Sequence, residues 1–289
     1  MKIRCLIFFV AGLLVLNVFA WQEVFELNNP AYLQVYFFSV GQGDSQFIET
    51  PQGHQILIDG GPNSSVLEKL NKTMPFWDKS IDVVILTHPE KDHMSGLLEV
   101  LKRYKVDYFI WTGVIKNNAE NKILAELLDE LIKNSEKDPI KILNVFAGIK
   151  IKSGNAQMEI IYPFENLAGQ EIKDLNNTSV VGKLDYGNIS FLFTGDISSV
   201  TEKKIVGLYE LKSDVLKVAH HGSKYSTSEL FLQAVAPKIA VIGVGKNSYG
   251  HPTQEVLNRL ANSGITTLRT DRDGDVKILS DGKNIKIKN

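Results

Sequence analysis

Residues 87–96 read Thr-His-Pro-Glu-Lys-Asp-His-Met-Ser-Gly and directly follow an apolar run, Ile-Asp-Val-Val-Ile-Leu, at residues 81–86. The apolar run predicts a buried strand, and we expect a helix to begin near Met94. Imidazole nitrogen suits zinc, manganese or iron, and carboxylate oxygen adds negative charge that holds a divalent ion. This concentration of such groups favours a metal site over a polar loop with two incidental histidines. The candidate ligands in this stretch are His88, Glu90, Asp92 and His93.

Other apolar runs along the chain also end beside side chains that can bind metal. The runs at residues 189–194, 215–219 and 239–244 repeat the pattern, as do two earlier runs at 35–40 and 55–58. A Gly-Asp pair after one strand is typical of an ordinary turn. The repeated order along one chain instead predicts strand ends that converge on an active site. The side chains that follow these runs are Asp44, Asp59, Asp196, His220, His221 and His251.

The order of these motifs resembles the metallo-β-lactamase superfamily of binuclear metal hydrolases. Within that superfamily, the chain is similar to the hydrolase domain of the ComEC family of DNA-uptake channel proteins over about residues 32–280. The resemblance implies an α/β fold, a four-layer αββα sandwich with helices outside two facing sheets. The strings that carry it are Gly-Gln-Gly-Asp at 41–44, Asp-Gly-Gly at 59–61, Thr-Gly-Asp at 194–196, His-His-Gly-Ser at 220–223 and Gly-His-Pro at 250–252.

The resemblance also implies a metal cofactor. The family motif HxHxDH places its first two histidines on one ion and its Asp-His pair on the other. Glu90 stands at the second histidine, which makes that position harder and favours manganese over zinc. Asp196 matches the carboxylate that bridges both ions, and His251 matches the late histidine. The implied cofactor is two divalent ions, manganese or zinc, held by His88, Glu90, Asp92, His93, Asp196 and His251.

Catalytic roles follow from the same resemblance. His220 and His221 match a position of phosphodiesterase members where an imidazole donates a proton or stabilises phosphoryl charge. The sequence leaves open which of them acts; with Asp92, they are the expected catalytic residues. Ser223 is expected to contact phosphate. The family's middle histidine has no counterpart before Asp196, and Asn177 in that region is expected to bind metal weakly, hold water or contact substrate.

Two acidic residues are expected to support the metal ligands. Asp59 follows a strand and is expected to accept the free N–H of a ligand histidine, because metal-bound histidines commonly require such a partner. Asp44 either does the same or stabilises the turn at residues 41–43.

The length, composition and net charge of the chain bear on its domain organisation and its binding partners. A chain of 289 residues with 44% hydrophobic content is long enough for one large α/β domain. We expect a single catalytic domain over residues 21–289, acting as a monomer without a fixed protein partner. The net charge of −1 gives no electrostatic signature of nucleic-acid binding.

The first twenty residues read as a secretory signal. Lys2 and Arg4 precede an apolar stretch at residues 6–16, and Val-Phe-Ala at 18–20 offers a cleavage site. The alternative is an uncleaved anchor, since the apolar segment approaches the lower limit of about 17 residues for a membrane span. Either reading predicts an exported protein, secreted or held at the membrane. The single cysteine, Cys5, lies in this segment, so the mature chain forms no internal disulfide.

The resemblance therefore implies a metal-dependent phosphodiesterase that acts on DNA or another phosphodiester. One alternative is hydrolysis of another ester, a lactone or a β-lactam, because the same metal chemistry serves carbonyl and phosphorus centres. A second is a non-catalytic metal-binding protein, suggested by the missing middle histidine. A fold alone does not decide among these substrates.

Overall fold

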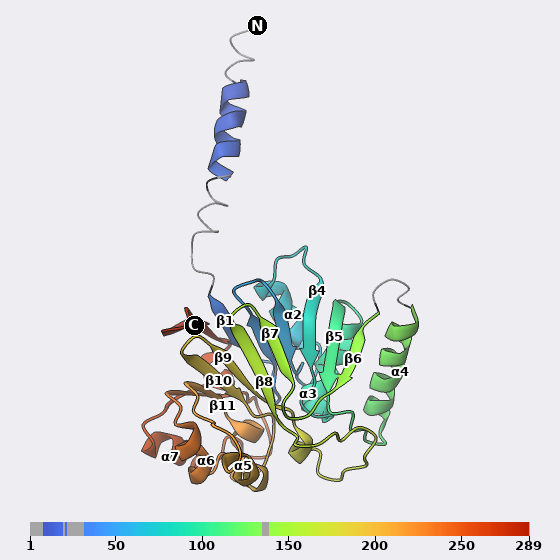
Figure 1. Ribbon diagram of the computed structural model, residues 1–289, viewed down its shortest axis with the longest axis vertical. Coiled ribbons are helices and arrows are strands. Elements are labelled where there is room, and N and C mark those ends of the chain that lie inside the picture. The colour runs from blue at the N-terminus through green and yellow to red at the C-terminus, as the bar shows by residue number, and fades with distance from the viewer. Residues whose placement is uncertain (1–7, 20, 22–31, 135–138, 289) are drawn as a thin grey trace.

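The computed structural model describes residues 8–19, 21, 32–134 and 139–288 (Figure 1). Within these residues, fifteen strands form two sheets. The strands of the first sheet are β1 (Leu33–Phe37), β2 (Gln46–Glu49), β3 (Gln55–Ile58), β4 (Ser80–Ile85), β5 (Lys105–Trp111), β6 (Lys141–Asn144), β14 (Val276–Ser280) and β15 (Ile285–Lys288). The strands of the second sheet are β7 (Lys150–Ser153), β8 (Ala156–Tyr162), β9 (Val181–Tyr186), β10 (Ile189–Phe193), β11 (Val215–Lys217), β12 (Ile239–Ile242) and β13 (Thr266–Arg269).

Both sheets mix parallel and antiparallel neighbours. The first has the order β15-β14-β1-β2-β3-β4-β5-β6, and the second has the order β13-β12-β11-β10-β9-β8-β7. The helices are α2 (Ser65–Thr73), α3 (Lys91–Leu101), α4 (Ala119–Asn134), α5 (Ser199–Val206), α6 (Glu229–Val235), α7 (Gln254–Asn262) and α8 (Thr270–Asp273), with 3-10 turns η1 (Asn176–Thr178) and η2 (Ala219–Gly222).

Three apolar layers hold the sandwich together. The sheets face each other across a central core, where the rings of Phe37 and Phe193 stack at 6.1 Å. Helices α2, α3 and α4 cover the outer face of the first sheet, while α5, α6 and α7 cover the second. Each fully buried large apolar side chain contributes about 1.5–3 kcal/mol. The four-layer αββα sandwich implied by the sequence resemblance is confirmed.

Local sequence patterns explain which face of a strand or helix is buried. In β1, Leu33, Val35 and Phe37 point to the central core, because alternate side chains of a strand face the same side. In α4, leucines at helical spacing pack against the first sheet.

The strand directions separate two edges of the sandwich. Strands β3, β4 and β5 run parallel, and β1 runs in the same direction because it pairs antiparallel with β2, which pairs antiparallel with β3. Their carboxyl ends share one edge, which we call the site edge. The chain enters β1 at Leu33 on the opposite edge, where β4 and β5 also begin.

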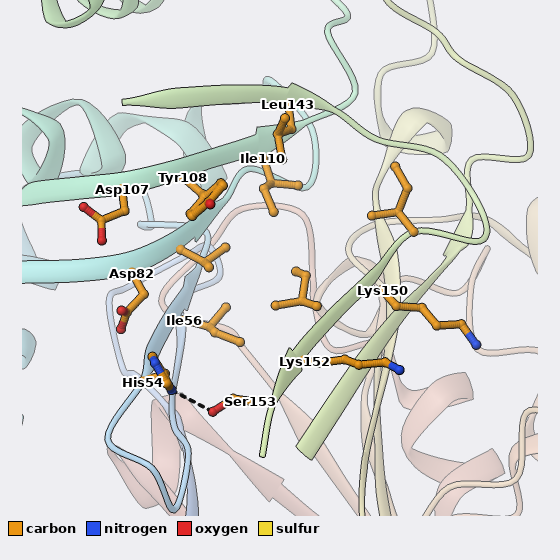
Figure 2. A pocket seen from close by; sticks show the side chains of 13 residues that line it. His54, Ile56, Asp82, Asp107, Tyr108, Ile110, Leu143, Lys150, Lys152 and Ser153 are labelled. Atoms are coloured by element: carbon orange, nitrogen blue, oxygen red, sulfur yellow. Dashed lines mark hydrogen bonds between the residues drawn. The ribbon is translucent and has the colours of Figure 1, made fainter. Parts of the chain in front are cut away.

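A cavity of about 440 Å³ lies between the sheets and is shown in Figure 2. Apolar side chains such as Ile56 and Ile110 line it, and His54 hydrogen-bonds to Ser153 at its rim, with 2.9 Å between Nδ1 and Oγ. The lining contains none of the predicted metal ligands, so this cavity is separate from the candidate site.

Part of the predicted export signal lies outside the described residues, including Lys2, Arg4 and Cys5. Residues 8–19 form a helix with exposed apolar side chains. Among the described helices, none has the length and hydropathy needed to cross a membrane.

Candidate metal centre

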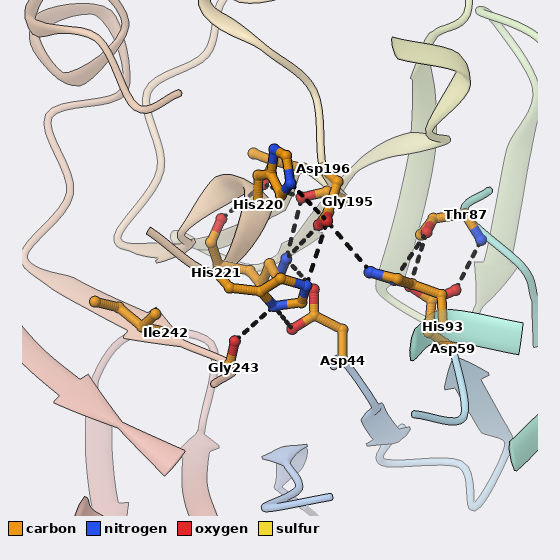
Figure 3. Close-up of polar contacts among 12 residues, drawn as sticks. Asp44, Asp59, Thr87, His93, Gly195, Asp196, His220, His221, Ile242 and Gly243 are labelled. Atoms are coloured by element: carbon orange, nitrogen blue, oxygen red, sulfur yellow. Dashed lines mark hydrogen bonds and ion pairs between the residues drawn. The ribbon is translucent and has the colours of Figure 1, made fainter. Parts of the chain in front are cut away.

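Four buried side chains meet at the site edge and form the candidate metal centre (Figure 3). Their ligand atoms all lie within 4.8 Å of one another. Each comes from a different segment: the loop after β1, the first turn of α3, the loop after β10, and η2 after β11. They are Asp44, His93, Asp196 and His221.

Helix α3 begins earlier than the sequence predicts. It starts at Lys91 rather than near Met94, and Glu90 precedes it with an extended backbone. Asp92 and His93 therefore project from a helical turn instead of a loop. A carboxylate in the first turn of a helix is favourable because it faces the positive end of the helix dipole.

His93 lies between two carboxylates. Its Nδ1 donates to Asp59 Oδ2 at 2.7 Å, and its Nε2 lies 3.4 Å from Asp196 Oδ2. Asp59 is itself fixed, because its Oδ1 accepts the Thr87 amide at 2.8 Å and its Oδ2 accepts the Thr87 hydroxyl at 2.7 Å. This chain of bonds holds the His93 ring in one orientation with Nε2 facing Asp196.

Replacing Asp59 by asparagine is expected to weaken metal binding about 10–100-fold, the usual effect of removing the partner of a ligand histidine. The amide cannot supply the negative charge that His93 Nδ1–H faces. Titration calorimetry with Mn²⁺ would measure the change. Asp107→Asn is the matched control, because Asp107 is a surface residue of β5 paired with Lys105. Equal affinities for the two variants would contradict the orienting role of Asp59.

His221 has a similar arrangement on the second sheet. Its Nδ1 donates to the Gly243 carbonyl at 2.7 Å, while Nε2 lies 3.3 Å from Asp196 Oδ2 and 3.2 Å from Asp92 Oδ2. His220 and His221 both have positive φ, 50° and 53°. Such backbone costs about 1–2 kcal/mol for a residue with a side chain. This strained turn directs the two adjacent rings differently, so that His221 is buried and His220 is partly exposed.

His88 is the third buried imidazole at this edge. Its Nδ1 lies 3.1 Å from Thr87 Oγ1 and 3.3 Å from Ser179 Oγ. Both hydroxyls already donate elsewhere, to Asp59 and to the Asn176 carbonyl, so His88 Nδ1 is the donor in these contacts. All three imidazoles thus use Nδ1 as a donor and direct Nε2 elsewhere.

A buried lysine lies beside the cluster and was not singled out from the sequence. Lys217 Nζ forms an ion pair with Asp44, donates to the Gly195 carbonyl at 3.0 Å, and lies 3.5 Å from Asp196 Oδ1. Burial lowers the pKa of Lys217, but Asp44 and Asp196 outweigh it and raise the pKa above its usual value. The available signal was a charged residue inside the apolar run at 215–219.

The electrostatics of the cluster favour a cation. Burial lowers the pKa of His221, yet Asp196 and Asp44 raise it to about 10. Burial likewise opposes protonation of His93, but Asp196 and Asp59 hold the pKa of His93 well above its usual value. The carboxylates therefore draw protons onto both imidazoles. A divalent ion would supply that positive charge instead.

The donor set also fits a metal ion. The buried atoms His88 Nε2, His93 Nε2 and Asp196 Oδ1 have no hydrogen-bond partner among the described residues. Imidazole nitrogens with carboxylate oxygens suit manganese, iron or zinc. The residues placed to hold an ion are Asp92, His93, Asp196 and His221, with Asp44 beside them.

Of the six ligands implied by the resemblance, His93 and Asp196 belong to the four-residue cluster, whereas His88, Glu90, Asp92 and His251 lie outside it. Glu90 precedes the first turn of α3, and its carboxylate reaches outward to Lys116 Nζ at 3.2 Å. His251 lies beyond His220, with 5.5 Å between the ring centroids. His221, which the resemblance gave a catalytic role, lies beside Asp92 and Asp196.

Two further predictions concern polar residues near the site. Asn177 Oδ1 accepts from Ser198 N and Oγ, each at 2.9 Å, and from Thr201 Oγ1 at 2.8 Å. The Asn177 amide oxygen is therefore used to hold the start of α5, which differs from the predicted metal or substrate contact. Ser223 is buried, and its hydroxyl accepts from the Tyr225 amide at 3.4 Å.

A row of rings connects the cluster with solvent. Centroid distances are 5.4 Å from His93 to His221, 6.1 Å from His221 to His220, and 5.9 Å from His251 to Tyr249. Tyr249, at the outer end of the row, is 73% exposed. Asn247 fixes this outer loop, because its Oδ1 accepts the amides of Tyr249 at 3.0 Å and His251 at 3.1 Å.

Comparison with known proteins identifies the family. Residues 54–218 match the family model described as a beta-lactamase superfamily domain. The chain belongs to the metallo-β-lactamase superfamily. Two solved structures support the fold: the metallo-beta-lactamase fold protein YhfI from Bacillus subtilis and the diiron beta-hydroxylase CmlA from Streptomyces venezuelae. YhfI has a TM-score of 0.54 at 12% identity, covering 86% of this chain and 100% of its own. CmlA has a TM-score of 0.52 at 14% identity, covering 86% and 54%.

Among curated proteins, this metallo-β-lactamase superfamily member is similar to competence and recombination proteins. ComE operon protein 3 of Bacillus subtilis is 31% identical over 264 residues, covering 84% of this chain and 32% of the relative. Competence protein ComA of Neisseria gonorrhoeae is 30% identical over 254 residues, covering 86% and 32%. The chain spans about a third of the length of these relatives. The predicted resemblance to the ComEC family is confirmed, and the chain is a metallo-β-lactamase superfamily hydrolase related to that family.

Proposed function

We propose that this chain is a divalent-metal-dependent phosphodiesterase that cleaves nucleic acid outside the cytoplasm. The observation that carries the proposal is the buried cluster of two imidazoles and two carboxylates, with the partly exposed His220 beside it. The similarity to proteins named for competence and recombination supports nucleic acid as the substrate. The apolar segment at residues 6–16 supports export.

A bound divalent ion would polarise a phosphoryl oxygen and lower the pKa of water. Residues of the protein orient the candidate ligand side chains and balance the buried charge. Asp59 and the Gly243 carbonyl fix the rings of His93 and His221. Lys217 holds Asp44 and balances part of the buried negative charge.

We propose that one ion binds more tightly than a second. Asp92, His93, Asp196 and His221 gather around one position. The other position of the family motif has fewer candidate ligands. His88 supplies an imidazole there, whereas Glu90 faces Lys116 and the family's middle histidine has no counterpart in this sequence. Manganese is the preferred ion in this proposal, since carboxylates make up half of the tighter set.

The decisive experiment supplies the full chain with Mn²⁺ or Zn²⁺ separately and measures hydrolysis of a substrate panel. The panel contains single- and double-stranded oligonucleotides, bis(p-nitrophenyl) phosphate, a lactone and a chromogenic β-lactam. Cleavage of oligonucleotides, faster with Mn²⁺, is the expected result. Turnover of the lactone or β-lactam alone would replace the proposal with the second hydrolase class. A protein that binds metal but turns over nothing would be a binding protein.

His220 is proposed to donate a hydrogen bond to phosphoryl oxygen. Burial lowers the pKa of His220 more than Asp196 raises it, so the imidazole is neutral near pH 7 and serves as an N–H donor. We expect His220→Ala to reduce turnover about 100-fold, as for loss of one preorganised donor. The loss should be equal for oligonucleotide and for bis(p-nitrophenyl) phosphate. A much smaller loss for the activated ester would instead identify His220 as a proton donor to the leaving group.

A further inference from the structure

Two aromatic side chains project into solvent from the edge opposite the metal centre. Phe76 is 81% exposed and Trp77 is 73% exposed, and their rings pack edge to face at 4.8 Å. They lie in the loop between α2 and β4, and β4 begins at Ser80 on the edge where β1 also begins. The fold leaves this pair uncovered, although burying a large apolar side chain is worth about 1.5–3 kcal/mol.

The loop that carries the pair is fixed at its base. The Asp78 amide donates to the Pro75 carbonyl at 2.9 Å, which places Phe76 and Trp77 at the two central positions of a turn. The Asp78 carboxylate accepts from the Ser80 amide at 3.0 Å and from Gln55 Nε2 at 2.8 Å. The aromatic pair is therefore presented by an ordered turn.

The surroundings of the pair fit a lipid interface. Lys72 and Lys79 flank the turn, and Lys72 is 67% exposed. Aromatic rings and lysines together are typical of protein segments at the membrane–water boundary, because the rings enter the headgroup region while the ammonium groups remain hydrated.

The position of the chain's apolar segment points to the same partner. The helix at residues 8–19 carries exposed apolar side chains, among them Phe8 at 77% and Phe19 at 61%. Ten residues, 22–31, separate Trp21 from Tyr32, where the described domain begins. At about 3.3–3.6 Å per residue, the eleven steps from Trp21 to Tyr32 span at most about 40 Å. A lipid-bound segment would therefore keep the edge that carries Phe76 and Trp77 near the bilayer.

We propose that Phe76 and Trp77 form a membrane contact that orients the domain. The ring pair enters the interfacial region of a bilayer, and the opposite site edge, with the metal centre, faces the aqueous phase. The proposal does not depend on the metal-dependent activity, so the two can fail separately.

Tryptophan fluorescence tests the orientation in the full chain. In a Trp21→Phe background, the remaining tryptophans are Trp77 and Trp111, and Trp111 is 8% exposed in the core beneath α3 and α4. The chain is mixed with vesicles of phosphatidylcholine and phosphatidylglycerol that contain brominated phosphatidylcholine. We expect Trp77 emission to shift to shorter wavelength, to be quenched by the bromines, and to lose its quenching by aqueous iodide. A Trp21→Phe, Trp77→Phe variant gives the Trp111 background.

A reporter on the site edge provides the control. Tyr249 has the same exposed fraction as Trp77, 73%, so Tyr249→Trp in the double-phenylalanine background places a tryptophan at an equally exposed position on the site edge, at the outer end of the row of rings. This tryptophan should remain open to iodide when vesicles are added. Three results would overturn the proposal: no flotation with vesicles, Trp77 still quenched by iodide in floated protein, or iodide protection that appears without vesicles and grows with protein concentration, which would show that a second copy covers the pair.

Discussion

Replacing Asp196 by asparagine is expected to reduce the proposed phosphodiester cleavage about 1,000-fold or more, because metal-ion stabilisation is worth several kcal/mol and each 1.36 kcal/mol is tenfold in rate. Asp196 Oδ2 faces both His93 Nε2 and His221 Nε2, at 3.4 and 3.3 Å. An amide keeps the shape of the side chain but removes the charge that attracts the ion. Steady-state kinetics with Mn²⁺ and elemental analysis of the dialysed protein would measure both effects.

Glu90→Gln is the matched control for Asp196→Asn. It also exchanges a carboxylate for an amide, but the Glu90 side chain is 34% exposed and reaches Lys116 instead of the cluster. We expect this variant to keep its metal content and activity. A loss of metal in Glu90→Gln comparable to that in Asp196→Asn would show that Glu90 turns inward when an ion binds.

Replacing Lys217 by methionine is expected to lower the free energy of unfolding by about 3–5 kcal/mol, the usual cost of leaving one partner of a buried ion pair without the other. The Lys217 side chain is 1% exposed, and Asp44 and Asp196 remain buried beside the vacated position. Urea denaturation in the presence of a chelator would measure the loss without a contribution from bound metal.

A double variant, Asp44→Asn with Lys217→Met, separates this charge effect from packing. The amide that replaces the Asp44 carboxylate carries no charge that needs compensation, so the double variant should recover much of the lost stability. Lys238→Met is the surface control, because Lys238 pairs with Asp214 while 74% exposed, and such pairs are worth about 0–1 kcal/mol. A single Lys217→Met loss no larger than this control would mean that the buried pair contributes little.

The fold could be predicted because its signals are local and repeated. Apolar strands alternate with helices from β3 to β6 and from β10 to β13, and polar turns follow many of these strands. The same regularity indicated which turns gather: the structure brings Asp59, Asp92, His93 and Asp196 to one edge. These residues lie at one edge because of the direction of the strands that precede them, and the sequence pattern indicates where those strands end.

The rest of the site depends on backbone geometry that residue types do not specify. Two adjacent histidines look equivalent in sequence, yet their left-handed backbone brings buried His221 to both Asp92 and Asp196 and leaves His220 partly exposed, with its Nε2 3.9 Å from Asp196 Oδ2. Glu90 occupies a motif position, but its extended backbone before α3 directs it to Lys116. In the sequence, Lys217 is a charged residue that interrupts an apolar strand. Its role as the ion-pair partner of Asp44 depends on a contact with a loop that is distant in sequence.

The carboxylates around His93 and His221 favour protonation of both imidazoles in the ion-free protein. Asp196 and Asp44 raise the pKa of His221 to about 10, and Asp196 and Asp59 raise the pKa of His93 well above its usual value, so protons compete with an ion for both rings. An ion that takes both nitrogens must release both protons, so its apparent affinity should rise up to about a hundredfold for each unit of pH. The acidity of the surroundings would therefore decide how completely the protein is loaded with its ion.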